Sequence, residues 1–292
     1  MSKVYIDKAE VEYGEESYEA AKNILRKAKF KLKNKKVLIK PNLVTSDSSI
    51  SGITADISFC KAILDKLDNC KVTIGNDSNN FKQTHYDILE KEYNCEIVCF
   101  DKLEEKDIIF KPVKTPFEFN EIPIAKHVLD ADYVVSLAKL KIHALCQVTL
   151  SLKNMFGCVP TRHHRVRIHP SIRKALLDIL QVRYPDFGLV DGIIGNQVEE
   201  VASNPMRSNI LLASHDPLAL DVIGTRCMGI DENDIEFLKR AIKFYKFDVN
   251  KIDVIGEQVK NVMKEYNREF GLKTKLRYAV EMLRSKVIKS TS

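Results

Sequence analysis

The sequence predicts an α/β protein with a mainly parallel or mixed sheet and helices on both of its faces. Short apolar runs rich in Val and Ile alternate along the chain with segments of helical periodicity, which is the pattern of strands joined by helical crossovers. The composition agrees, because 45% of the 292 residues are hydrophobic and 29% are charged, as in an ordinary globular protein. No internal repeat or low-complexity linker interrupts the first part of the chain, so we expect one α/β core over residues 1–259.

The expected strands and helices follow one another in alternation. The strands are expected at Val37–Ile39, Val72–Ile74, Glu96–Phe100, Tyr133–Leu137, Leu189–Val190, Ile210–Ala213 and Ile252–Ile255. The helices are expected at Glu16–Lys29, Ala55–Leu67, Ser171–Tyr184, Pro217–Met228 and Asp234–Phe244.

Residues 260–292 differ from the core in composition and are expected to form a basic amphipathic helical tail. Two polar helices are expected there, separated at Gly271, and the second carries an apolar stripe bordered by basic residues. Such a helix either packs on the core with a solvated outer face or contacts an anionic membrane surface or an acidic partner.

The charge pattern argues against nucleic-acid binding. Residues 260–292 hold nine Lys or Arg and three Glu, so this tail alone accounts for the net charge of +6 and the remainder is neutral. A neutral body offers no broad basic face to neutralise phosphates. No segment reaches the roughly 18 to 20 apolar residues of a membrane-spanning helix. The seven cysteines are scattered, which fits a reducing, cytoplasmic location.

Polar residues follow the expected strands at their carboxyl ends, where open α/β sheets bind ligands. Lys40 and Asn42 flank Pro41, whose fixed φ stiffens the turn after the first strand. Asp77 follows the next strand, although residues of this type also form ordinary turns. We expect these side chains to meet at one edge of the sheet.

The densest polar segment surrounds the fourth expected strand. Lys139, Lys141 and His143 alternate, which places them on one side of the strand if it continues. Lys153 and Asn154 follow in an apolar segment, where an ammonium is costly to bury unless it is paired or deprotonated. This segment is therefore a candidate for catalysis and substrate binding.

Two further segments supply candidates. The segment "RHHRVRIH" is expected to be a loop that closes on a carboxylate or phosphate through Arg162, His163, His164 and Arg167, with metal ligation by its histidines as an alternative. Asp191 is expected to orient His143 or Lys153 or to bind a cation. Asp216 is a candidate substrate ligand, but it also precedes a proline as a helix N-cap does.

In several of these segments the chain resembles DUF362, a family of domains of unknown function. The likeness rests on "LIKPNLV", "KVTIGNDS", "LKIHALCQVTLSLKNMFGCVP", "PDFGLVDGIIG" and "ILLASHDPLALD". The resemblance implies that the strongest family positions fall on Lys40, Asn42, Asp77, Lys141, His143, Lys153, Asn154, Gly157, Asp191, Asp216 and Asp221. Many relatives carry a cysteine-rich ferredoxin-like module, but this sequence has none, and we expect no iron–sulfur cluster.

Three functions are open from the sequence. In the first, the protein is an enzyme that grips a small carboxylated or phosphorylated metabolite with Lys and Arg, while His143 or Lys153 acts as general acid or base and Asp191 tunes it. In the second, the same site binds a metabolite without catalysis and the tail contacts a partner or membrane. In the third, Asp77, Asp191 and His143 serve an enzyme that depends on Mg²⁺ or another divalent metal.

Overall fold

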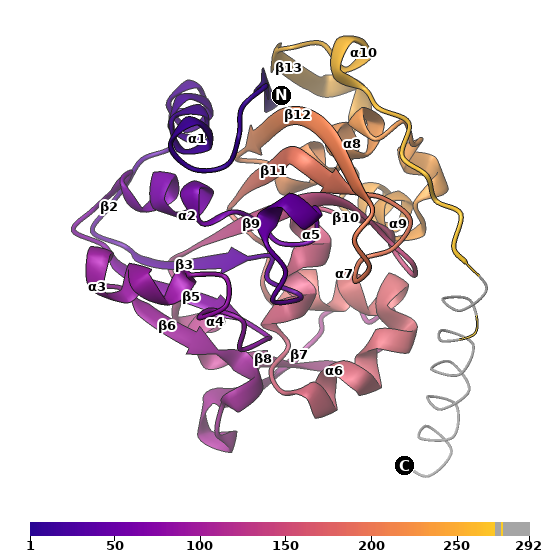
Figure 1. Cartoon of the computed structure of the whole chain (residues 1–292). Helices are drawn as coiled ribbons and strands as arrows, with labels where there is room; N and C mark the ends of the chain where they lie inside the picture. The colour runs from indigo at the N-terminus through magenta and orange to yellow at the C-terminus, as the bar shows by residue number, and fades with distance from the viewer. Residues whose placement is uncertain (272–275, 277–292) are drawn as a thin grey trace.

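The protein is described here from a computed structural model of the chain, in which residues 1–271 and 276 are described. Its centre is a nine-stranded sheet of order β13-β1-β12-β11-β9-β3-β5-β6, with β10 pairing alongside β9 (Figure 1). These strands are β1 (Ser2–Lys8), β3 (Lys36–Pro41), β5 (Lys71–Asn76), β6 (Glu96–Cys99), β9 (Tyr133–His143), β10 (Gln147–Thr149), β11 (Phe187–Asn196), β12 (Pro205–Ser214) and β13 (Ile252–Gly256).

The sheet is mixed. Strands β6, β5, β3, β9 and β11 run parallel, whereas β12 runs antiparallel to both β11 and β1. Because of this reversal, β12 ends at the opposite edge of the sheet from β3, β5 and β9. The edge at which those three strands end, at Pro41, Asn76 and His143, is called the C-terminal edge below.

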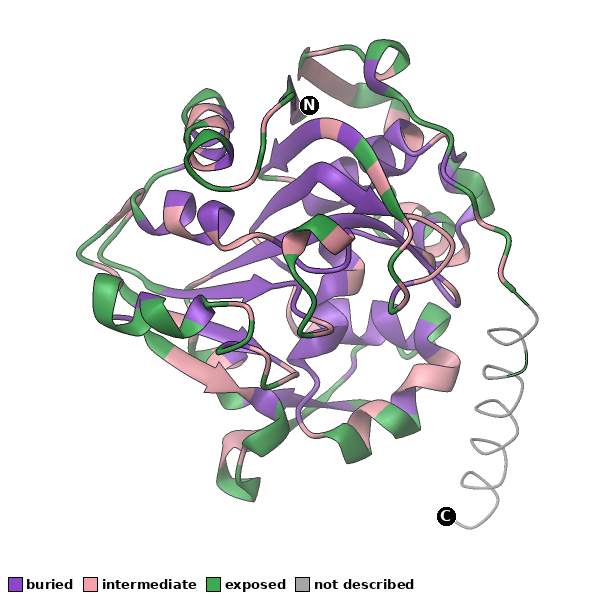
Figure 2. Ribbon diagram, in the orientation of Figure 1, coloured by how far each residue is buried: buried purple, intermediate pink, exposed green. Residues whose placement is uncertain are grey.

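Helices cover both faces of the sheet (Figure 1). One face packs against α1 and α2 through side chains such as Ile24 and Phe59, and the other packs against α7 and α8 through Leu176 and Leu220. Buried residues accordingly fill both sides of the sheet (Figure 2). The helices are α1 (Glu15–Lys27), α2 (Ile57–Leu64), α3 (Leu89–Tyr93), α4 (Lys126–Asp130), α5 (Ser151–Asn154), α6 (Arg162–Ile168), α7 (Ile172–Val182), α8 (Pro217–Cys227), α9 (Glu236–Phe244) and α10 (Val259–Val262).

The α/β class is confirmed, and so are all seven expected strands and five expected helices, with shifted ends. Strands β1 and β10 and the hairpin of β7 (Ile108–Pro112) with β8 (Glu121–Ala125) were not predicted. A further small pair joins β2 (Leu32–Lys33) and β4 (Leu67–Asp68). These strands are short or carry charged residues, so their apolar alternation is weak and their pairing depends on distant segments.

One prediction about local structure was wrong. The segment "RHHRVRIH", expected as a loop, forms helix α6. The Thr161 side chain accepts a bond from the His164 backbone N–H at 3.5 Å, and the His169 backbone N–H bonds to the Arg165 carbonyl at the other end. Its basic side chains are therefore spread around a helix instead of sharing one surface.

The first part of the expected tail packs on the core. The helix expected before Gly271 is shorter than predicted: only α10 (Val259–Val262) forms, and residues 263–271 contain no helix. Tyr266 is 6% exposed, and its hydroxyl lies 2.8 Å from the Ser208 hydroxyl. The apolar stripe expected beyond Gly271 falls almost wholly outside the described residues. Through residue 271, no helix combines the length and apolarity that crossing a bilayer requires.

Candidate functional site

An amide network fixes Lys40 at the C-terminal edge. The Lys40 Nζ donates to Asn76 Oδ1 at 2.7 Å and to the Pro41 carbonyl at 2.9 Å. Asn154 Nδ2 donates to the Lys40 carbonyl at 2.8 Å, and Asn42 Nδ2 donates to Asn154 Oδ1 at 3.3 Å. These hydrogen bonds hold the ends of β3 and β5 and helix α5 in one arrangement. Lys40, Asn42 and Asn154 lie together, as predicted.

The carboxylate of Asp77 lies 3.8 Å from the Lys40 Nζ. Burial lowers the pKa of Lys40, and Asp77 opposes this effect. Gly157 makes the arrangement sterically feasible, because a Cβ there would lie 2.6 Å from Lys40 Cε and 2.8 Å from Asp77 Oδ1. Such distances are too short for carbon, so only glycine fits without moving the pair.

The Lys139 ammonium has a different partner from the other cations. It lies 2.7 Å from Asp191 Oδ2, and both side chains are completely buried. Tyr13 donates to Asp191 Oδ1 at 2.9 Å, and the Asp56 N–H donates to Oδ2 at 3.1 Å. Asp191 is therefore committed to Lys139, its cross-strand neighbour. The prediction that Asp191 orients His143 or Lys153 was wrong.

Lys141 is buried beneath two loops. Its Nζ donates to the Ile53 carbonyl at 2.8 Å and to the Glu200 carbonyl at 3.5 Å. Burial lowers its pKa well below the ordinary value, with Lys153 adding to the effect and Glu200 opposing it. The Glu200 carboxylate accepts the Ala144 N–H at 2.9 Å instead of pairing with Lys141. Lys141 thus joins the two loops and carries an ammonium that is poorly compensated.

His143 ends β9 and is 2% exposed. Its Nδ1 accepts the backbone N–H groups of Leu145 at 3.1 Å and Cys146 at 3.2 Å. Burial first, and the charge of Lys153 next, lower the pKa of His143 well below its ordinary value. The imidazole is therefore neutral at physiological pH.

Lys153 acts electrostatically on several of these groups. It is half-buried on α5, and its Nζ lies 5.4 Å from the centre of the Phe156 ring. Its charge contributes to lowering the pKa of Lys40, Lys141 and His143. Among the described residues, neither Lys141 nor Lys153 has a carboxylate within ion-pair distance, in contrast to Lys40, Lys139 and Arg165. The expectation of a partly buried Lys153 is confirmed.

The basic residues of α6 divide between two sides. Arg165 lies 3.5 Å from Asp77 Oδ2 and donates to Asp101 at 2.9 Å. The ring of His169 packs 5.9 Å from that of His143. If the segment had been assigned as a helix, their spacing of four residues would have placed both on one face.

The predicted residues of α6 lie elsewhere. Arg162, His163 and Arg167 are exposed, and His164 lies 2.8 Å from the Thr161 hydroxyl through Nδ1. His164 and Arg167 help to line a cavity of about 430 Å³ with residues of β7 and β8. In the described part of the chain, no hydrogen bond or ion pair links these four residues to Lys141, His143 or Lys153.

Asp216 does not join this group, and the alternative that it is a helix N-cap is confirmed. It follows β12, whose antiparallel direction carries it to the edge opposite the site. Its Oδ1 accepts the N–H groups of Leu218 and Ala219, both at 3.1 Å, so it caps α8. Asp221 is likewise structural: it accepts the Ser151 and Leu152 N–H groups at 2.8 Å and thereby fixes the start of α5.

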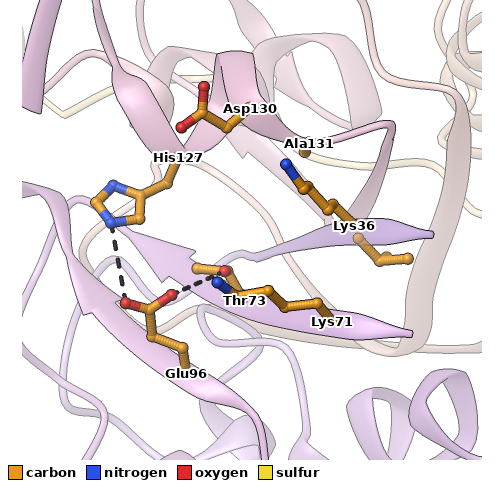
Figure 3. A pocket seen from close by; sticks show the side chains of 8 residues that line it. Lys36, Lys71, Thr73, Glu96, His127, Asp130 and Ala131 are labelled. Carbon is orange, nitrogen blue, oxygen red and sulfur yellow. Dashed lines mark hydrogen bonds and ion pairs between the residues drawn. The ribbon is translucent and has the colours of Figure 1, made fainter. Parts of the chain in front are cut away.

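A separate cavity of about 110 Å³ opens at the amino-terminal ends of β3, β5 and β6 (Figure 3). Lys36 and Lys71 extend along it, but Glu96 is bonded to Thr73 at 3.2 Å and lies 4.0 Å from His127. Its carboxylate is therefore already engaged, and this cavity lies at the opposite edge of the sheet from Lys40.

The arrangement gives no support to a divalent-metal site built from the predicted residues. Over residues 1–271, no three His, Cys, Asp or Glu side chains are grouped as metal ligands. Asp77 faces Lys40 and Arg165, while Asp191 faces Lys139. Each of these carboxylates is thus directed at a protein cation.

The site lies within a recognised sequence family. The family described as "Domain of unknown function (DUF362)" matches residues 37–226, which include every residue from Lys40 to Asp221 discussed above. This chain belongs to the DUF362 family.

Two other proteins resemble this DUF362 chain. The thylakoid-associated protein sll1697 of Synechocystis sp. is 32% identical over 121 residues, which are 39% of this chain and 37% of that protein. The lactate racemase apoprotein of Thermoanaerobacterium thermosaccharolyticum superposes with a TM-score of 0.45 and 10% identity, covering 79% of this chain and 58% of that one.

Most of the DUF362 positions therefore meet at the C-terminal edge. The group comprises Lys40, Asn42, Asp77, Lys141, His143, Lys153, Asn154 and Gly157, and it is called the cationic cluster below. Arg165, Asn76 and Glu200 adjoin it. Arg165 and Asn76 belong to segments that the sequence singled out, whereas Glu200 was missed. Glu200 carries no distinctive local pattern, because only the loop between β11 and β12 brings it to this edge.

Proposed function

We propose that the protein is an enzyme that binds a small carboxylated or phosphorylated metabolite at the cationic cluster. The observation that carries the proposal is the pair of lysines, Lys141 and Lys153, which the described residues leave without an ion-pair partner. Their charges are close enough for Lys153 to lower the pKa of Lys141.

The energetics favour an anionic ligand. An ammonium removed from water is costly unless it is paired, and a carboxylate or phosphate would supply the missing charge through short, charge-assisted hydrogen bonds. Asp77 faces Lys40 and Arg165, and Glu200 offsets the lowering of the Lys141 pKa only in part, because burial and Lys153 have larger effects. An anion between Lys141 and Lys153 would relieve their mutual repulsion.

Lys153 is our candidate for acid–base chemistry. It is half-buried, whereas Lys141 is fully buried and bonded to two carbonyls. Asp221 holds the two residues that precede Lys153 in place through their N–H groups. A positioned amine of this kind can exchange a proton with a bound substrate, which typically contributes about 10²–10⁴-fold in rate.

Ligand binding can be tested before the reaction is known. Thermal unfolding would be followed with panels of small carboxylates and phosphate esters, alongside mass spectrometry of anions that co-purify with the protein. We expect an anion that stabilises the wild type to lose this effect with Lys153→Met, but not with Lys239→Met, which removes an exposed lysine of α9. Equal stabilisation of both variants, or none for any anion, would contradict the proposal.

A non-catalytic binder would give the same binding results, so turnover of the co-purified anion must be measured separately.

Contact of the tail with a partner or membrane stays a prediction. Because Tyr266 and Val262 are buried, a chain ending at residue 258 should be less stable than one ending at residue 271. Only the chain that ends at residue 271 can therefore be used to test tail binding. Equal stability of the two chains would refute this reasoning.

A further inference from the structure

The hydrogen bonds of His143 define which of its nitrogens carries the proton. A neutral imidazole has one N–H and one acceptor nitrogen. Nδ1 faces two backbone donors, the N–H groups of Leu145 at 3.1 Å and Cys146 at 3.2 Å. A proton on Nδ1 would break both bonds and direct three donors at one another. The proton of the neutral ring is therefore on Nε2.

Nε2 is available for a ligand. Among the described residues, no group is hydrogen-bonded to this nitrogen, and the residue is 2% exposed. The ring lies beside the two lysines of the cationic cluster, since Lys153 and Lys141 both lower the pKa of His143.

The groups around the ring oppose a second proton. Lys141 from β9, Lys153 from α5 and His169 from the segment after α6 all disfavour a positive charge on His143. Glu200, from the loop between β11 and β12, acts in the opposite direction, but its carboxylate also accepts the Ala144 N–H. Burial adds to the cationic effect and is the largest contribution. The imidazolium is consequently unfavourable on every side except that of Glu200.

We infer that His143 is a permanently neutral hydrogen-bond donor whose Nε2–H binds an acceptor oxygen of the ligand, and that it is not the general base. The inference rests on the proposed function, since the ligand is the anion of the cationic cluster. It restricts that ligand to one with a carboxylate, phosphoryl or carbonyl oxygen directed at His143. Lys141, Lys153 and His143 then present donors alone, so a ligand group that is itself a donor is rejected.

Nitrogen NMR of the free protein tests the tautomer without any ligand. Protein labelled with ¹⁵N in histidine would be recorded from pH 8 to pH 5, and His143 would be assigned by comparison with His143→Asn. We expect a protonated Nε2, an unprotonated Nδ1 and no titration over this range. A resonance that titrates near pH 6.5, the ordinary region for histidine, or a proton on Nδ1 would overturn the inference.

The contact with an anion is tested on the same sample. Acetate and inorganic phosphate would be titrated in, with acetamide as the neutral control for acetate. We expect the anions to shift the Nε2 resonance of His143 and acetamide to leave it unchanged. If the anions stabilise the protein in a Lys153-dependent manner without moving Nε2, the role of His143 is wrong while the proposed function stands. If neither anion binds, the proposed function loses its support and the contact is refuted with it.

Two variants separate the two nitrogens. His143→Asn retains an acceptor near the position of Nδ1 and should keep the melting temperature while lowering anion affinity roughly tenfold or more, as expected for loss of a hydrogen bond to a charged group. His143→Gln places an amide near the position of Nε2 and should retain more of the affinity at a lower melting temperature. The reverse order of affinities would contradict the assignment.

Discussion

The buried pair of Lys139 and Asp191 offers the sharpest test of the structure. Both side chains are completely buried, 2.7 Å apart. Replacing Lys139 with Met leaves the Asp191 carboxylate in the core with only neutral partners, namely the Tyr13 hydroxyl and the N–H groups of Asp56 and Ile193. Removing one partner of a buried ion pair costs about 3–5 kcal/mol, so we expect the free energy of unfolding to fall by about that amount.

The double variant makes the test specific. Combined Lys139→Met and Asp191→Asn removes both charges but keeps a side-chain oxygen as acceptor for Tyr13. Because the uncompensated charge is gone, the double variant should be more stable than Lys139→Met alone by about 2 kcal/mol or more. Urea unfolding followed by circular dichroism would measure all variants at pH 7. A Lys139→Met cost below about 1 kcal/mol, or additive effects in the double variant, would refute a buried ion pair.

Three further predictions concern neighbouring groups. Gly157→Ala should displace Lys40, whose Cε would lie 2.6 Å from the new Cβ, and lower stability by about 1–3 kcal/mol; an unchanged urea midpoint would contradict this. Burial raises the pKa of Asp221 to about 8 from 3.8, so the folded state holds this proton longer than the unfolded state. Stability should then fall relative to Asp221→Asn as the pH rises from 5 to 8, by up to about 1.4 kcal/mol per unit, and parallel pH profiles would refute it. In thiol labelling of the native protein, Cys70 and Cys99 should react before the five buried cysteines, which mass mapping at short times would check.

The sequence predicted the local features of the site well. The alternation of Lys139, Lys141 and His143 follows from the period of a strand, which depends on neighbouring residues alone. The turn at Pro41 is local in the same sense. These features, together with the hydrophobic runs, were sufficient to predict the α/β class and the convergence of Lys40 with Lys153.

The partners of these side chains depend on contacts between distant segments. Three residues that alternate on one strand have three different environments: Lys139 faces Asp191, Lys141 faces the carbonyls of two loops, and His143 faces backbone N–H groups. The direction of β12, which carries Asp216 away from the site, is likewise set by its pairing with β11.

The sequence by itself therefore determined most strands of the central sheet and the longer helices, the fold class and the chemical types of residue available at one edge of the sheet. Tertiary structure alone decided which charges are neutralised and which are not. The reason is physical: hydrophobic period is a property of adjacent residues, whereas the compensation of a buried charge depends on which distant groups lie within a few ångströms of it. Lys139 has a carboxylate partner and Lys141 and Lys153 have none among the described residues, and this difference makes them the candidates for binding an anion.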